Sequence, residues 1–111
     1  MSSKDLDLTN PNCSVYDVMN IIGGKWKIDI IYHLGEGTLR FGELKKWLVP
    51  ITQQMLTKQL RELEKDGLIA RRVYNFIPPK VEYSLTQFGL SLKPVISSLC
   101  RWVTDNKKHI K

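Results

Sequence analysis

The segment TQQMLTKQLRELEKDGLI, residues 52–69, decides the fold of this chain because its two faces differ in character. On a helix with about 3.6 residues per turn, three leucines form one narrow stripe and polar or cationic side chains lie nearly opposite. Thr52 is a suitable N-cap, and Gly67 follows where a left-handed C-cap would fall. The segment predicts a bounded helix over about residues 52–66. Its expected buried side chains are Leu56, Leu60 and Leu63, and its expected outward side chains are Gln54, Thr57, Lys58, Arg61 and Lys65.

The outward face of this helix carries groups that can bind DNA bases. Amide side chains such as Gln53 and Gln54 can form paired hydrogen bonds with adenine edges, and Arg or Lys can bind guanine edges or phosphates. No carboxylate occurs in the segment before Glu62 and Glu64, toward its C-terminal end. This pattern favours a helix that enters a major groove by its N-terminus. An ordinary amphipathic surface helix explains the segment equally well when it is taken alone.

Length and charge restrict the classes of protein to be considered. A chain of 111 residues can form one domain with a real core, but it is too short for a separate substrate domain. Residues 40–80 hold nine Lys or Arg and four acids (+5), whereas residues 1–39 hold three bases and five acids (−2). Clustered cations favour a polyanionic partner because each neutralised phosphate releases counterions. A basic surface that only maintains solubility would not explain this clustering.

Other functional classes find no support in the sequence. There is no long apolar run and no signal-peptide pattern, so we expect a cytoplasmic protein without a membrane segment. Cys13 and Cys100 match no metal-binding or CxxC spacing, and with only His33 and His109 as histidines we expect no metal site. No Ser/His/Asp set or close acidic pair has a meaningful spacing. We therefore expect no enzyme and no cofactor.

Turn residues divide the N-terminal half into an arm and several helices. Residues 1–12 are polar and contain an Asn-Pro-Asn turn, so we interpret them as a flexible arm before a single domain of residues 13–111. Helical spacing then predicts helices that end at Gly23, at Gly35 and before Pro50. A short turn joins the last of these helices to the helix at 52–66. This order is the layout of a helix-turn-helix.

A β-hairpin, or wing, is predicted over about residues 68–85. Residues 68–76 are rich in β-formers, and Val81, Tyr83 and Leu85 alternate with polar residues, so two antiparallel strands are joined at Ile77-Pro78-Pro79-Lys80. Arg71, Arg72 and Lys80 could bring this hairpin to phosphates or into a minor groove. The expected fold is mainly α with a small β-hairpin (α+β), a winged helix-turn-helix.

The last segment, about residues 86–108, predicts a helix with more apolar surface than a small core needs. We expect Pro94 to kink this helix and the helix to bind a second copy of the chain. The alternative is that it folds back on its own domain. The apolar stripe comprises Phe88, Leu92, Val95, Ile96, Leu99 and Val103, with Trp102 beside it.

These segments resemble the HxlR group of winged-helix transcriptional regulators, within the broader MarR-like class. The resemblance implies a homodimeric bacterial or archaeal regulator that binds a two-fold symmetric operator in double-stranded DNA, with dimer contacts from both terminal helices. It implies base or backbone contacts from Gln53, Gln54, Thr57, Lys58 and Arg61, a wing contact from Lys80 and a phosphate contact from Arg40. The matching segments are Cys13, IGGKWK at 22–27, LRFGEL at 39–44, the run at 51–68 and PPKVEYSLTQFGLSL at 78–92.

The resemblance also concerns the signal to which such a regulator responds. Cys13 occupies the position at which redox- or electrophile-sensing members carry a reactive cysteine, although Ser14 follows it where Cys-Pro is common. A helix dipole favours the thiolate of a cysteine just ahead of a helix N-terminus. A structural thiol is the alternative. A small-molecule effector would also fit the MarR-like resemblance, although no residue identifies one.

A second function hypothesis comes from a different class. A winged helix can be a protein-protein interaction module without specific DNA binding. Such a module needs neither an outward helix face that begins without acids nor a basic hairpin, so the distribution of charge favours the DNA-binding hypothesis.

Overall fold

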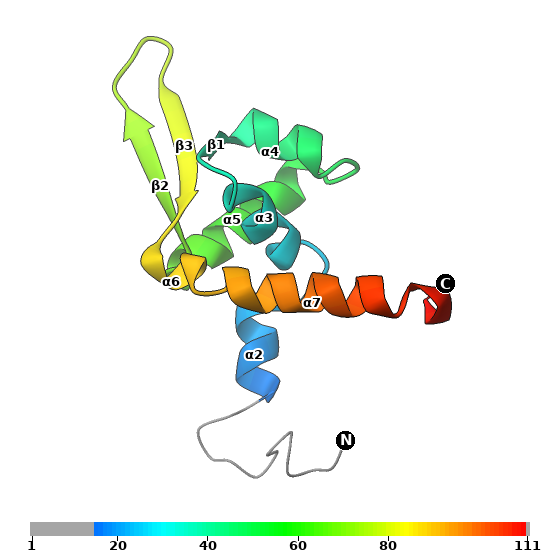
Figure 1. Ribbon diagram of the computed structural model, residues 1–111. Coiled ribbons are helices and arrows are strands. Elements are labelled where there is room, and N and C mark those ends of the chain that lie inside the picture. The colour runs from blue at the N-terminus through cyan, green and yellow to red at the C-terminus, as the bar shows by residue number, and fades with distance from the viewer. Residues whose placement is uncertain (1–14, 111) are drawn as a thin grey trace.

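The computed structural model describes residues 15–110, and Figure 1 shows how its elements are arranged. The predicted arm at 1–12 and Cys13 lie outside the described residues. The helices before the hairpin end close to the predicted turn residues. In chain order the elements are α2 (Val15–Ile22), α3 (Lys27–Leu34), β1 (Leu39–Arg40), α4 (Phe41–Trp47), α5 (Gln53–Lys65), β2 (Ile69–Tyr74), β3 (Lys80–Leu85), α6 (Gln87–Leu90), α7 (Lys93–Asp105) and the 3₁₀ turn η1 (Lys107–His109).

A small antiparallel sheet carries the wing. Strands β2 and β3 pair from Ile69 opposite Leu85 to Tyr74 opposite Lys80, which confirms the predicted antiparallel hairpin. The two-residue strand β1 adds to the other edge of β3, which gives the order β1-β3-β2. With α4 and α5 joined by a short turn, this sheet completes the predicted winged helix-turn-helix.

The leucine stripe of α5 forms the centre of the core. Leu56, Leu60 and Leu63 are all buried, and they belong to one cluster with side chains from α3, α4 and the start of β2. Full burial of one leucine side chain contributes about 1.5–3 kcal/mol. This burial fixes which face of α5 points inward, so the polar face is held outward by the core. The other members of the cluster include Ile30, Ile31, Leu34, Leu44, Leu48, Leu68 and Ile69.

Both ends of α5 have the predicted caps. The hydroxyl of Thr52 accepts a hydrogen bond from the Met55 N–H at 3.1 Å. Gly67 has a φ of +80°, in the left-handed region that favours glycine, and the next N–H, of Leu68, donates to the Leu63 carbonyl at 3.0 Å. The predicted bounds of the central helix are confirmed to within one residue at each end.

The C-terminal segment differs from its prediction. Residues 86–108 do not form one helix kinked at Pro94, because α6 ends at Leu90 and α7 begins at Lys93. Pro94 lies in the first turn of α7, where a helix does not need the N–H that proline lacks and where its fixed φ favours helical geometry. Proline thus begins a helix here, and the prediction of a kink within a continuous helix was wrong.

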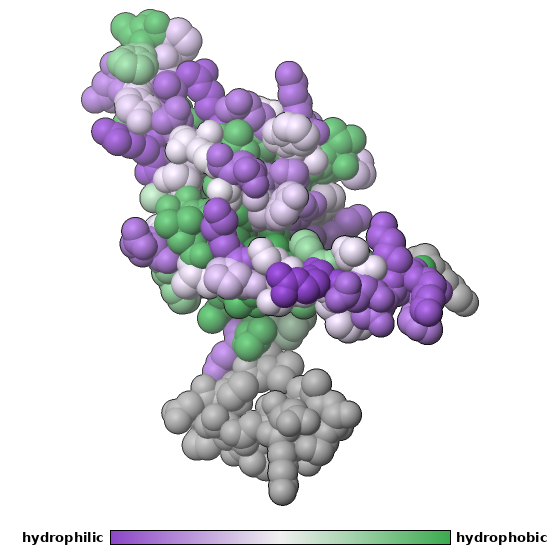
Figure 2. Space-filling model, in the orientation of Figure 1, coloured by the Kyte–Doolittle hydropathy of each residue, from purple (hydrophilic) through white to green (hydrophobic). Residues whose placement is uncertain are grey.

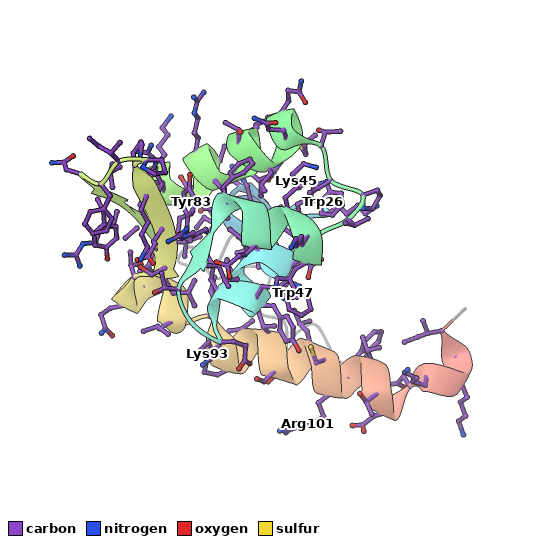
Figure 3. All side chains as sticks on the ribbon, turned by 90° about the horizontal axis from the view of Figure 1, so that it is seen from above. Trp26, Lys45, Trp47, Tyr83, Lys93 and Arg101 are labelled. Carbon is purple, nitrogen blue, oxygen red and sulfur yellow. The ribbon has the colours of Figure 1, made fainter. Side chains whose placement is uncertain are left out.

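Three aromatic side chains with helical spacing are exposed rather than buried, namely Trp47, Phe88 and Trp102. The helical spacing of Phe41, Leu44, Trp47 and Leu48 favours one apolar stripe, yet Trp47 is 65% exposed, and its ring stacks on His33 with the ring centroids 5.5 Å apart. Leu44 and Leu48 supply the buried contacts of this stripe. Figure 3 labels Trp47 beside α4.

Candidate nucleic-acid interface

The five predicted contact residues of α5 lie together on its polar face. They line one shallow groove along the helix, which also includes the side chain of Glu62. Figure 3 shows α5 at one edge of the molecule, and α7 crosses at the opposite edge. The residues of this face are Gln53, Gln54, Thr57, Lys58 and Arg61, and all of them except the half-buried Thr57 are exposed.

A second hollow joins α5 to the sheet. Its lining includes Thr57 and Arg61 of α5, and Arg71 and Tyr83 from the two wing strands. Arg71 pairs with Tyr83 in register, so its side chain shares the face of the sheet that is turned toward the helices. One hollow therefore extends from the helix to the base of the wing, and Phe41, Leu60 and Glu64 complete its lining together with Gln53.

The sequence predicts wing contacts for both Arg71 and Arg72, but the two side chains lie on different faces of the sheet. The structure puts Arg72 opposite Glu82, on the other face of the sheet from Arg71. The sequence already indicates that the two arginines lie on different faces, since neighbouring side chains alternate between the faces of a strand. The largely apolar Tyr83, which pairs with Arg71, marks the face that is turned toward the core.

The outer face of the sheet gathers the remaining predicted contacts. Glu82 lies on the central strand, with Arg40 as its partner on β1 and Arg72 as its partner on β2. Lys80 Nζ lies 3.2 Å from Glu82 Oε2. We call Arg40, Arg72, Lys80 and Glu82 the wing cluster.

Two neighbours organise the wing cluster. Tyr74 lies under both cations of the hairpin, with Arg72 at 4.9 Å and Lys80 at 5.1 Å from the ring centroid. A hydrogen bond from Tyr74, and a weaker effect of one from Lys80, hold the pKa of the Glu82 carboxyl below its usual value. The charges of Lys80 and Arg40 act in the same direction. Separately, the Glu43 carboxylate accepts a hydrogen bond from the Arg40 N–H at 2.9 Å, which fixes the backbone of Arg40 at the start of α4. The cluster is thus one arranged set of three cations around a single carboxylate.

A buried lysine neutralises the first carboxylate on the face of α5. Lys27, at the start of α3, is only 7% exposed, and its Nζ lies 2.9 Å from Glu62 Oε1. This hydrogen bond, with the nearby charges of Lys27, Lys58 and Lys65, holds the pKa of the Glu62 carboxyl below its usual value against the opposing effect of burial. Sequence reasoning did not predict this contact. It leaves less uncompensated negative charge beside the predicted DNA contacts.

Residues 15–110 contain no group of three or more His, Cys, Asp or Glu side chains arranged to bind a metal ion. Within the same range, no helix is both long and apolar enough to cross a membrane. Cys100 is exposed on α7 as an unpaired thiol.

The fold and this surface define the class of winged-helix DNA-binding proteins. The chain matches the HxlR-like helix-turn-helix family over residues 21–111, and it belongs to that family. It is 54% identical over 109 residues to YdeP of Bacillus subtilis, named an uncharacterized HTH-type transcriptional regulator, with 98% of this chain and 82% of the relative covered. It is also 54% identical over 99 residues to YtcD of the same species, with coverages of 89% and 79%.

Solved structures agree with this assignment. The redox regulator HypR in its oxidized form matches with a TM-score of 0.80 and 49% identity, over 85% of this chain and 97% of that chain. The HTH-type transcriptional regulator ytcD matches with a TM-score of 0.82 and 47% identity, over 86% and 99% of the two chains. The chain is thus a DNA-binding transcriptional regulator of the helix-turn-helix type.

Proposed function

We propose that the protein acts as a homodimer that binds a two-fold symmetric operator by sequence, with one α5 in each of two successive major grooves. The observation that carries this proposal is the polar face of α5, where Gln53, Gln54 and Arg61 are exposed on a helix whose other face is locked into the core. The amide groups lie in the first turn of α5 and the guanidinium of Arg61 two turns further on, and both kinds of group can form paired hydrogen bonds with base edges.

The cations of the sheet have a separate role in this proposal. Arg40, Arg72 and Lys80 bind phosphates and set the position of the protein on the duplex, and α5 supplies the base contacts. Arg71 lies in the hollow between α5 and the wing, so we include it among the phosphate contacts.

Exposed apolar side chains on the terminal helices support the dimer. On α7, Ile96 is buried, but Val95, Leu99, Trp102 and Val103 are exposed. Val18 and Met19 of α2 are exposed as well. Figure 1 shows α2 and α7 at the end of the molecule opposite the wing tip, so a partner there would leave α5 and the wing free. A large exposed apolar patch is typical of an interface.

The signal that we propose is oxidation or electrophilic modification of Cys13. Support comes from its position in the family pattern, and from the relatives HypR, solved in oxidized and reduced forms, and YodB of B. subtilis, solved after diamide treatment. A change at the thiol would act by shifting the spacing of the two recognition helices, which requires two states of the dimer. We propose a cytoplasmic regulator, and neither a cofactor nor an enzymatic reaction is part of this proposal.

Selection of bound duplexes from a random DNA library tests the function. We expect enrichment of an inverted repeat with half-site centres about one helical turn apart, or a multiple of it, and two protein chains bound to each duplex. Enrichment of a single asymmetric site at one chain per duplex would contradict the dimer and the symmetric operator. No enrichment at any salt concentration would favour the protein-interaction module.

A further inference from the structure

The tip of the wing is apolar, which neither the core nor the wing cluster explains. Ile77 has a relative exposure of 102%, and Phe76 is 58% exposed. Pro78 and Pro79 follow and complete the turn. Figure 2 shows this hydrophobic surface at the projecting end of the hairpin, away from the core of the domain. A side chain as exposed as Ile77 contributes almost nothing to folding, and a contiguous apolar patch of this kind is typical of a binding surface.

The tip is held in position and surrounded by cations. The Phe76 ring stacks on Tyr74, with centroids 5.7 Å apart and an interplanar angle of 15°. The same Tyr74 ring contacts Arg72 and Lys80. Two prolines fix two φ angles of the turn, which lowers the entropy lost when the tip is immobilised. The hairpin therefore presents a stiff apolar end with positive charge directly behind it.

Charge and continuity identify the partner of this tip as DNA. The hollow lined by Arg61 and Arg71 connects α5 to the base of the wing, so a duplex bound by α5 passes beside the hairpin. A minor groove is lined by phosphates on both sides and is narrow, which suits an apolar tip flanked by Arg72 and Lys80. Apolar side chains of this kind, including Phe, Ile and Pro, are known to press into minor grooves and part base steps. An apolar patch that bound another protein would have no need of these two cations.

We propose that Ile77, supported by Phe76, enters the minor groove beside each operator half-site and selects A·T over G·C base pairs there. This inference rests on the proposed binding of α5 in the adjacent major groove. The physical basis is the amino group of guanine, which projects into the minor groove and would lose its hydration against an apolar side chain that cannot accept a hydrogen bond. A·T pairs carry no such group.

The test compares duplexes that differ only beneath the tip. A hydroxyl-radical footprint of the wild-type complex first locates the minor-groove sugars protected outside the contacts of α5. Operators are then made with A·T, inosine·cytosine or G·C at those positions. Inosine·cytosine has no amino group in the minor groove, yet it resembles G·C in the major groove. We expect equal affinity for A·T and inosine·cytosine, and about tenfold weaker binding to G·C.

Three variants assign the effect to the tip. Ile77→Ser should bind the A·T operator about tenfold more weakly and lose the preference over G·C, whereas Ile77→Leu should retain both properties. Ile110→Ser removes an exposed isoleucine from the opposite end of the described chain and should leave both properties unchanged.

The outcomes separate this inference from the proposed function. Wild-type affinity and preference in Ile77→Ser, or inosine·cytosine that behaves like G·C, would overturn the role of the tip while operator binding by α5 stands. A wild-type protein that binds no duplex by sequence would overturn both proposals together. Unchanged DNA binding in Ile77→Ser would also exclude DNA as the partner of this apolar surface and favour a protein ligand.

Discussion

Lys27 Nζ lies 2.9 Å from Glu62 Oε1, so a buried amine at the start of α3 pairs with a carboxylate on the polar face of α5. The two partners differ in their surroundings, because the Lys27 side chain is 8% exposed and the Glu62 side chain 40% exposed. Loss of the Lys27 amine and loss of the Glu62 carboxylate should therefore change the stability of the fold by different amounts. The pair also links α3 to α5, and so helps to fix the position of α5 beyond what the core alone provides.

The stability of the fold should respond more to the loss of Glu62 than to the loss of Lys27. Glu62→Gln leaves a buried ammonium without its counter-ion, and we expect a loss of about 1–3 kcal/mol in the free energy of unfolding. Lys27→Met keeps most of the packing, and its orphaned carboxylate reaches water, so we expect a change below about 1 kcal/mol. Urea denaturation of the two variants measures the difference. The reverse order would show that Lys27 acts through its packing alone.

Stability should fall in mild acid because the pKa of the Glu62 carboxyl is lowered in the folded state. A carboxyl whose pKa is lowered by folding stabilises the protein at a pH above its ordinary pKa of 4.5. This stabilisation is lost as the pH falls through the lower pKa of the folded state. The lowered pKa of Glu82 acts in the same direction. Denaturation midpoints measured from neutral pH to below the ordinary value should decline less in Glu62→Gln than in the wild type. An identical decline would mean that the pair does not contribute to acid sensitivity.

Single substitutions on α5 should each remove one base contact and weaken operator binding. Arg61→Ala and Gln54→Ala should each weaken operator binding by about 1–3 kcal/mol and leave folding unchanged. Arg101→Ala is the matched control for an exposed arginine, since Arg101 lies on α7, and Figure 3 shows α7 at the edge of the molecule opposite α5. Fluorescence anisotropy on a labelled operator gives the affinities. Equal affinity of both α5 variants and the wild type would overturn the assignment of this face.

Phosphate contacts from the wing cluster should show a different signature. Arg72→Ala and Lys80→Ala should weaken binding to operator and unrelated duplexes alike, and each should reduce the slope of log affinity against log salt by about 0.9. Lys107→Ala, at the C-terminal end, should keep the wild-type slope. A selective loss of operator preference in Lys80→Ala would instead indicate a base contact.

The thiol hypothesis makes its own prediction. Diamide should weaken operator binding by the wild-type protein, and Cys13→Ser should abolish this response, because only the thiolate of that residue is proposed to react. Cys100→Ser is the control, since Cys100 is the other cysteine of the chain. A response that persists in Cys13→Ser would exclude Cys13 as the sensor.

Local patterns in the sequence predicted most of the fold. The spacing of Leu56, Leu60 and Leu63 identified the buried face of α5, and Thr52 and Gly67 marked its ends, because caps and periodicity depend on neighbours a few residues away. Pro94 was misjudged, since proline disrupts a helix interior but favours a first turn, and only the location of the preceding break distinguishes the two cases.

Contacts between distant segments were harder to predict. Strand alternation could have placed Arg71 toward α5, but the pairing of Arg40 and Arg72 around Glu82 depends on the register of three strands. The pairing of Lys27 with Glu62 depends on how α3 crosses α5, which no local pattern records. The α5 face was therefore predictable residue by residue, whereas the groups that position it and the wing were not.

The most direct test of the central claim is a salt titration of binding to a selected operator and to a scrambled duplex of the same composition, with wild type and Arg61→Ala compared in parallel. We expect the wild type to prefer the operator about a thousandfold or more, with steep weakening by salt on both duplexes. In Arg61→Ala this preference should fall by about 1–3 kcal/mol while salt-sensitive binding to the scrambled duplex remains. Equal affinity of the wild type for both duplexes would contradict sequence recognition by α5.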